Sequence, residues 1–187
     1  MGIYFTADTH FFHKNIIEYE NRPFADVGEM NEAMIGRWNA TVKSPNDEVY
    51  ILGDFALCKG REANGLLARL TGRKYLIRGN HDSFLEDKEF DDGHFVWIRD
   101  YHVLRHNKRK FVLFHYPIAA WDSQDKGAAH LYGHVHNTAN TNHHGFLREM
   151  PNAVNVGVDI WGYRPTALTR FWPGAIFLTV RESQTNG

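Results

Sequence analysis

Near its start the chain runs Ile3-Tyr4-Phe5-Thr6-Ala7-Asp8-Thr9-His10, a short apolar segment that ends at two polar residues. The apolar run predicts a buried strand, and residues two apart in an extended segment point to the same side. Asp8 and His10 can therefore face one cation from the end of this strand. A single Asp-x-His pair is more often an exposed polar pair, so its weight depends on whether the pattern recurs.

The same arrangement, an apolar run followed by polar residues, recurs further along the chain. The later runs end at Gly53-Asp54, Gly79-Asn80-His81-Asp82, His115 and Gly133-His134-Val135-His136. Singly, Asp54 could cap a helix and Asn80 could form an Asx-turn. Open α/β sheets place their sites at the carboxyl ends of their strands, so together these blocks predict one shared site.

Two helical patterns separate the first three predicted strands. Asp26 and Glu29 resemble a capping box, and apolar residues at helical spacing follow, which predicts a helix over about 27–42. A second amphipathic segment, from Ala63 to Leu70, ends before Gly72. The alternation of strand and helix predicts a parallel arrangement in this half of the chain.

The second half of the chain has a hairpin-like pattern. Strands are predicted over 95–104 and 110–115 with a polar turn at 106–108, and further strands over 153–158 and 175–180. Two sheets packed face to face with helices outside them accommodate both halves. The expected fold is α/β, a four-layer α/β/β/α sandwich of two mixed sheets flanked by helices.

Length and composition restrict the class of protein. A chain of 187 residues with 43% hydrophobic and 23% charged residues predicts one globular domain, residues 1–187, with no cap domain. A net charge of −1 gives no broad electrostatic footprint for nucleic acid or an anionic membrane. The single Cys58 excludes an internal disulfide, and no membrane span or secretory signal is visible. We expect a cytoplasmic protein, and no oligomeric state is predicted.

The ordered blocks Asp-x-His, Gly-Asp, Gly-Asn-His-Asp, His and Gly-His-x-His resemble the calcineurin-like metallophosphoesterase superfamily, in particular its small single-domain bacterial and phage members. The resemblance runs from Asp8 to about Asp159. It implies that seven side chains bind two divalent cations. The first cation would be bound by Asp8, His10 and His136, the second by Asn80, His115 and His134, with Asp54 bridging them. His130 is the alternative to His115.

The resemblance also implies catalytic roles and a reaction. His81 would lie beside the phosphate and stabilise the developing charge or protonate the leaving oxygen, and Asp82 would orient its ring. Manganese is the expected metal, although iron, zinc, nickel or cobalt also suit oxygen and imidazole donors without a thiolate. A hydroxide held by the cations would attack phosphorus. The implied activity is hydrolysis of a phosphate monoester or diester, with a phosphodiesterase slightly favoured.

The loop that follows His10 is expected at the rim of the site. His13, Asn15 and Arg22 are predicted to hold substrate phosphate oxygens together with Asn80 and His81, and Arg22 suits this because its fork matches phosphate. The alternatives are a turn cap for Asn15 and an ion pair with Glu20 or Asp26 for Arg22. Aromatic residues considered for stacking on a base, most of them expected in the core, are Phe11, Phe12, Trp121, Trp161 and Tyr163.

Two other functions remain open from the sequence. One is a noncatalytic metal-binding scaffold on the same fold, and the other is a nuclease. All seven ligand positions and His81 are present, which favours an enzyme, and the near-neutral charge disfavours a nuclease. The expected partner is a small phosphate ester or nucleotide, with nucleic acid possible but not favoured and no membrane.

Overall fold

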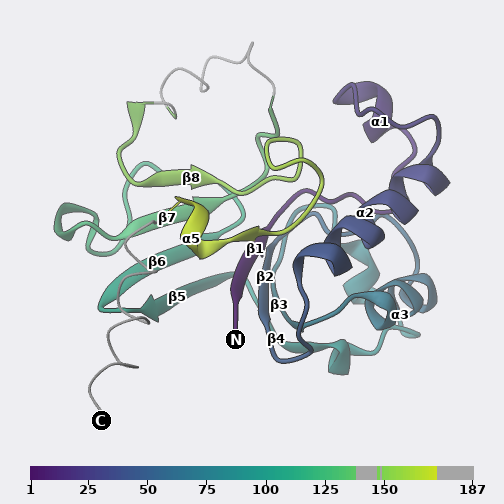
Figure 1. Cartoon of the computed structure of the whole chain (residues 1–187), viewed down its shortest axis with the longest axis horizontal. Coiled ribbons are helices and arrows are strands. Elements are labelled where there is room, and N and C mark those ends of the chain that lie inside the picture. The colour runs from purple at the N-terminus through teal and green to yellow at the C-terminus, as the bar shows by residue number, and fades with distance from the viewer. Residues whose placement is uncertain (138–146, 148, 172–187) are drawn as a thin grey trace, which may run out of the picture.

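The computed structural model describes residues 1–137, 147 and 149–171, and Figure 1 shows its elements. The strands are β1 (Ile3–Thr6), β2 (Glu48–Leu52), β3 (Arg73–Ile77), β4 (Phe95–Arg99), β5 (Tyr101–His106), β6 (Arg109–Phe114), β7 (Ala129–Tyr132), β8 (Ala153–Asn155) and β9 (Thr166–Ala167). The helices are α1 (Ile16–Tyr19), α2 (Val27–Thr41), α3 (Gly60–Arg69) and α5 (Leu168–Phe171), with 3-10 turns η1 (Ser83–Glu86), η2 (Asp92–His94) and η3 (Gln124–Lys126). The strand predicted over 175–180 lies outside the described residues.

The strands form two sheets. The first has the order β4-β3-β2-β1-β9, in which β1 to β4 are parallel and β9 is antiparallel to β1. The second has the order β5-β6-β7-β8, in which β5 is antiparallel to β6 and the other pairs are parallel. Both sheets are mixed and helices flank them, which confirms the expected fold class.

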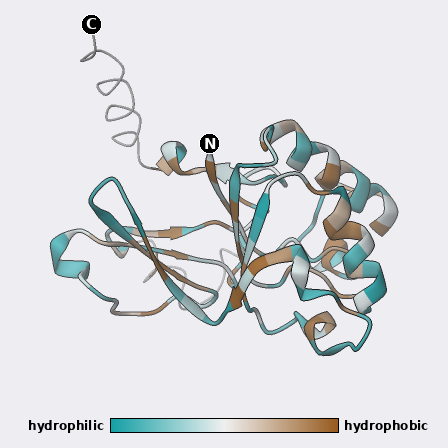
Figure 2. Cartoon of the chain, turned by 90° about the horizontal axis from the view of Figure 1, so that it is seen from below, coloured by the Kyte–Doolittle hydropathy of each residue, from teal (hydrophilic) through white to brown (hydrophobic). Residues whose placement is uncertain are grey.

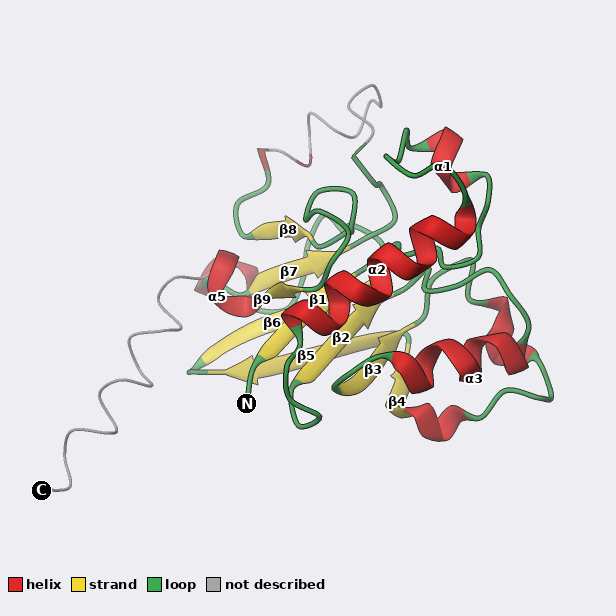
Figure 3. Cartoon of the chain, turned by 45° about the vertical axis from the view of Figure 1, so that its right-hand side comes forward, coloured by secondary structure: helices red, strands yellow, loops and turns green. Residues whose placement is uncertain are grey.

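The layers of the fold are visible in Figures 1 and 3. Helices α2 and α3 cover one face of the first sheet, and the second sheet lies on the other side of it. Apolar side chains from both sheets fill the space between them, among them Phe5, Leu52, Ile77, Leu113 and Leu131. Each such side chain contributes roughly 1.5–3 kcal/mol when fully buried, so this core fixes one sheet against the other.

Helix α2 forms as its sequence predicts. The Asp26 side chain accepts a hydrogen bond from the Glu29 backbone N–H at 2.9 Å, which satisfies one of the free donors at the helix start. Its buried face carries Met34 and Trp38, and Figure 2 shows brown and teal residues alternating along the helices. No helix in the described ranges is long and apolar enough to cross a membrane.

The prediction of a single strand over 95–104 was wrong. The chain forms β4 up to Arg99, which lies opposite Ile77 in the first sheet, and then β5 from Tyr101, which lies opposite Phe114 in the second. Only Asp100 separates the two strands. The backbone is extended on both sides of Asp100, and no glycine or proline in the local sequence marks the change of sheet.

The hairpin between β5 and β6 turns where the sequence predicts. Asn107 and Lys108 both have positive φ angles, 47° and 62°, as a two-residue hairpin turn requires. Cationic side chains gather here around a hollow of about 280 Å³, whose lining includes Arg105, Lys108, Arg109, Lys110 and Lys126. This group lies at the beginning of β6, the end opposite to His115.

Candidate metal centre

The structure brings the seven predicted ligands together in two adjoining groups. In each of two triads, Asp8 with His10 and His136 and Asp54 with His115 and His134, one donor atom per residue lies within 4.8 Å of the others. Asn80 joins the second triad, since its Oδ1 is 3.1 Å from Nε2 of His115. The histidine proposed as an alternative, His130, is buried on the outer side of the second sheet beside Trp121.

Asp54 lies between the two groups. Its Oδ2 is 3.6 Å from Nε2 of His10, and its Oδ1 is 3.6 Å from Nε2 of His115. Both separations are too long for a hydrogen bond. One carboxylate therefore presents an oxygen to each group, with space between it and the imidazole nitrogens.

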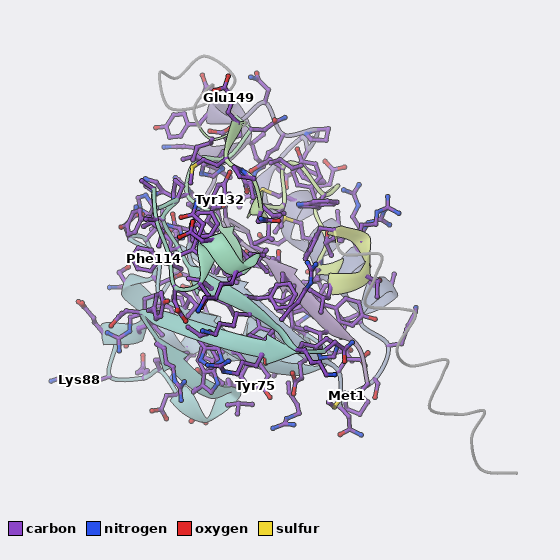
Figure 4. All side chains as sticks on the ribbon, turned by 90° about the vertical axis from the view of Figure 1, so that its left-hand side faces the viewer. Met1, Tyr75, Lys88, Phe114, Tyr132 and Glu149 are labelled. Carbon is purple, nitrogen blue, oxygen red and sulfur yellow. The ribbon has the colours of Figure 1, made fainter. Side chains whose placement is uncertain are left out.

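The carboxyl ends of five strands supply these side chains. Asp8, Asp54 and Asn80 follow β1, β2 and β3, whereas His115 and His134 follow β6 and β7. Figure 4 shows the last residues of β6 and β7, Phe114 and Tyr132, on the side of the molecule away from Met1. The two sheets are linked at this edge, because the Asp8 carboxylate accepts the backbone N–H of His134 at 2.9–3.0 Å.

Five of the ligands have an unusual backbone conformation. Asp8, His10, Asp54, His134 and His136 have φ angles of 54°, 49°, 51°, 71° and 45°. A non-glycine residue in the left-handed region costs of order 1 kcal/mol or more, and such residues cluster at functional sites. The fold holds these five side chains in strained positions that aim them at one space.

Two glycines allow the strand ends to approach closely. Gly53 has φ 85°, and a Cβ there would collide with Nδ1 of His115 and with the Gly79 backbone. A Cβ on Gly79 would in turn collide with the carboxylate of Asp54. The close contact between β2, β3 and the loop after β6 thus requires glycine at both positions.

Two of the histidines are held by hydrogen bonds on the nitrogen that faces away from the cluster. Nδ1 of His136 lies 3.0 Å from Oδ2 of Asp159, and Nδ1 of His115 lies 2.8 Å from the carbonyl oxygen of Leu52. Each partner accepts a hydrogen bond from Nδ1–H, and in that tautomer Nε2 of each ring has a lone pair for the cluster. A carboxylate or carbonyl behind an imidazole is the usual support of a metal-binding histidine.

The electrostatics of the cluster favour a cation. Burial raises the pKa of Asp8 to about 7, and burial together with the nearby His136 lowers the pKa of His10 to about 2. Neither ring nitrogen of His10 has a hydrogen-bond partner among the described residues, although both are buried. Neutral imidazole nitrogens and buried carboxylates fit a divalent cation, which would relieve the cost of burying the carboxylates.

Asp82 has a different role from the one expected. Its carboxylate accepts the backbone N–H groups of Asp54, Phe55 and Gly79 at 3.1, 2.7 and 2.7 Å. Burial nevertheless raises the pKa of Asp82 to about 6. The structure gives it no bond to the ring of His81 within the described residues. Asp82 fastens the loops after β2 and β3 to each other rather than orienting His81.

Arg22 also has a different role. Its guanidinium is buried and donates to the backbone carbonyls of Asp8 and Thr9 at 2.7 and 2.8 Å. It also pairs with Asp159, with Nε 2.9 Å from Oδ1. The prediction that Arg22 holds substrate phosphate was wrong, as was its proposed pairing with Glu20 or Asp26. Arg22 fixes the backbone at the first two ligands and the carboxylate behind His136.

The remaining predicted substrate contacts lie at different distances from the cluster. The ring of His13 lies 5.3 Å from that of His10 and 6.4 Å from that of His81. His81 is exposed, its ring is 5.5 Å from His10, and its backbone N–H donates to Oδ1 of Asp54 at 2.9 Å. Asn15 is exposed at the start of α1, where its side chain forms no cap hydrogen bond, and its role stays a prediction.

The aromatic residues considered for stacking are engaged in other packing, and Phe12 lies partly buried against the same apolar core as Phe11. Phe11 and Trp121 are buried in separate apolar cores. Trp161 donates its Nε1–H to the carbonyl of Asn155 at 2.8 Å, and Tyr163 packs on Phe24. The aromatic side chain that does touch the cluster is Tyr116, which sequence reasoning missed. Its position directly after His115 was the available signal.

Known proteins resemble this chain over most of its length. The family model of calcineurin-like phosphoesterases matches residues 1–166. An uncharacterised protein of Methanocaldococcus jannaschii is 37% identical over 168 residues, which cover 89% of this chain and 86% of that protein. The gene 66 protein of Mycobacterium phage L5 is 28% identical over 188 residues, which cover 85% of this chain and 87% of that protein. A solved structure of a protein of unknown function from Aquifex aeolicus matches with a TM-score of 0.71, 26% identity, and 91% and 97% of the two chains covered.

Proposed function

The chain belongs to the calcineurin-like phosphoesterase family, and from that premise we propose that it hydrolyses phosphate esters at a centre of two divalent cations. The observation that carries the proposal is the position of Asp54, which offers one carboxylate oxygen to each ligand group. A carboxylate shared in this way is suited to a two-metal site.

The donor set determines how the cations would be held. Asp8, His10 and His136 would hold the first cation and Asn80, His115 and His134 the second, with Asp54 between them. When bound, the pair would supply Lewis acidity and a water molecule whose pKa lies near neutrality. Oxygen and imidazole donors without a thiolate suit manganese, which we propose as the metal.

The side chains around the cations prepare the phosphate for attack. His81 is anchored through its backbone N–H to Asp54, while its ring remains exposed beside His10. The ring is therefore positioned to donate a proton to the leaving oxygen or to stabilise charge on the phosphate. His13 stands next to it and supplies a second imidazole at the same rim.

The charges at the rim favour a diester over a monoester. Arg22 is engaged with Asp159 and two backbone carbonyls, so its charge is not presented to a substrate. The described side chains at this rim include the imidazoles of His13 and His81 and the amide of Asn80, while the nearby Arg78 lies 3.8 Å from the carboxylate of Asp100. A diester carries one negative charge where a monoester carries two, so it depends less on a guanidinium to pair with that charge.

The alternative functions fit the structure less well. A nuclease would benefit from cations that lead to the site, but the basic group around Lys108 lies at the opposite end of β6 from His115. The two ends of β6, a strand of six residues, are roughly 15–20 Å apart. A noncatalytic scaffold has no need of an exposed imidazole beside the ligands, as His81 has here.

The proposal is tested by turnover of metal-reconstituted protein. Protein stripped with a chelator and then supplied with manganese should hydrolyse bis(p-nitrophenyl) phosphate faster than p-nitrophenyl phosphate. Asp54→Asn keeps the size of the side chain but removes its charge, and it should lose the metal-dependent rate. Equal rates with and without metal, or an active Asp54→Asn variant, would contradict the two-cation site.

A further inference from the structure

Three aromatic side chains form a continuous strip beside the second ligand group. The ring of Tyr116 lies 4.6 Å from that of His134 and 4.8 Å from that of His115. Phe114 follows at 5.6 Å from Tyr116, and Tyr101 at 6.4 Å from Phe114. The strip thus begins on a proposed ligand and leads away from it.

The fold places these rings on one face. Tyr101 and Phe114 are opposite each other in the β5–β6 pair, and Tyr116 is two positions beyond Phe114. Phe114 lies at the carboxyl end of β6, as labelled in Figure 4. Tyr101 and Phe114 therefore share one face of the second sheet, and Tyr116, in the bend directly after β6, continues their row to His115 and His134.

The strip is exposed although it is largely apolar. Tyr116 is 38% exposed and Tyr101 is 43% exposed, and both are among the most exposed large apolar residues of the described chain. The exposed ring of Tyr116 adjoins the candidate active site, and it provides a flat surface for another planar group.

The other sides of the rim have different chemistry. Beyond Asn80, a hollow of about 240 Å³ is lined mainly by polar and charged side chains, including Arg78, Ser83 and Glu86. On the side of the first ligand group, the exposed Tyr19 lies 6.2 Å from His13 and further from the ligands. Among the described residues, Tyr116 is an exposed aromatic ring that contacts both His115 and His134.

We propose that Tyr116, supported by Phe114 and Tyr101, binds the base of a nucleotide whose phosphate lies at the metal centre. This inference rests on the proposed function and narrows its substrate class to nucleotide esters. Tyr116 contacts the outer ligand His134 at 4.6 Å, so a group stacked on Tyr116 is one imidazole ring away from the metal centre. In a nucleotide the sugar likewise separates the base from the phosphate. Every base has a π-face, so the strip selects a nucleotide without selecting one base.

The test compares two ligands that differ only by the base. Adenosine 5′-monophosphate and ribose 5-phosphate are measured as inhibitors of the chromogenic diester turnover, and their inhibition constants are expressed as a ratio. The base should tighten binding roughly 5- to 100-fold. Tyr116→Leu should bring the ratio close to one. Tyr116→Phe is the matched control, because it retains the ring, and it should retain the ratio.

A second readout does not depend on turnover. Saturation transfer from the metal-free protein to the base protons of adenosine 5′-monophosphate should be seen with the native chain and with Tyr116→Phe, and be lost with Tyr116→Leu. A ratio near one in the native protein, or an equal effect of Tyr116→Leu on both ligands, overturns the base subsite. A loss of the saturation transfer in Tyr19→Leu but not in Tyr116→Leu would overturn it as well. Absence of turnover with retained, Tyr116-dependent transfer would refute the proposed hydrolysis and keep the subsite.

Discussion

Replacing Asp8 by asparagine should remove the part of the pH dependence of stability that this one carboxyl gives the metal-free protein. The Asp8 carboxyl is buried, and burial raises its pKa from 3.8 to about 7. In the unfolded chain the same group has its ordinary pKa. Between these two pH values the Asp8 carboxyl is protonated more often in the folded protein than in the unfolded chain. Its contribution to stability therefore falls as the pH rises.

The magnitude follows from the two pKa values. The full shift of about three units corresponds to about 4 kcal/mol, present below pH 4 and lost above pH 7. Between pH 5 and pH 8 the contribution of Asp8 alone falls by roughly 2–3 kcal/mol. Asp82, whose pKa burial raises to about 6, adds a smaller change of the same sign, which ends at a lower pH.

Urea unfolding in the presence of a chelator, at pH 5 and at pH 8, measures this difference directly. The buried imidazole of His10, whose pKa is lowered to about 2, changes stability in the opposite direction, so the comparison between the two proteins is the test. The change in the free energy of unfolding from pH 5 to pH 8 should be more favourable in Asp8→Asn than in the native chain by roughly 2–3 kcal/mol. Added manganese should stabilise the native chain more at pH 8 than at pH 5, because it binds the deprotonated carboxylate. The reasoning fails if Asp8→Asn and the native chain show the same dependence on pH without metal.

Three further substitutions separate structural from chemical roles. Asp82→Ala leaves three backbone N–H groups without their acceptor and should lower the free energy of unfolding by about 3 kcal/mol or more in a urea titration; a loss below 1 kcal/mol would contradict its fastening role. His81→Ala should bind manganese as the native protein does but lose roughly 10²–10⁴-fold in kcat, and an unchanged kcat would exclude His81 from the reaction. Asp159→Asn removes the charge behind His136 and should weaken manganese binding about 10- to 100-fold by calorimetry; unaltered affinity would show that this support is dispensable.

The sequence predicts which polar side chains gather at the strand ends, because that information is local. Asp8, Asp54, Asn80 and His134 each follow a short apolar run, and parallel strands bring their carboxyl ends to one edge. The distinction between His115 and His130 depends on which side of the second sheet each ring faces. Alternation along β6 and β7 decides this, and the structure places His115 at the inner edge.

The supporting contacts could not be predicted in the same way. Arg22 pairs with Asp159, which is 137 positions away, and nothing near Arg22 in the sequence signals that partner. Asp82 accepts hydrogen bonds from backbone N–H groups on another loop. Nearly every residue has a backbone N–H, so the sequence does not show which of them Asp82 will contact. The change of sheet at Asp100 is hidden for a related reason, since extended chain continues on both sides of it.

The shared carboxylate of Asp54 is tested most directly by electron paramagnetic resonance of the protein titrated with manganese. Two equivalents should bind, and their spectrum should show the magnetic coupling of two ions held by a common ligand. Asp54→Ala should lose this coupled signal. One bound ion, or two ions with the spectra of isolated manganese, would contradict the account.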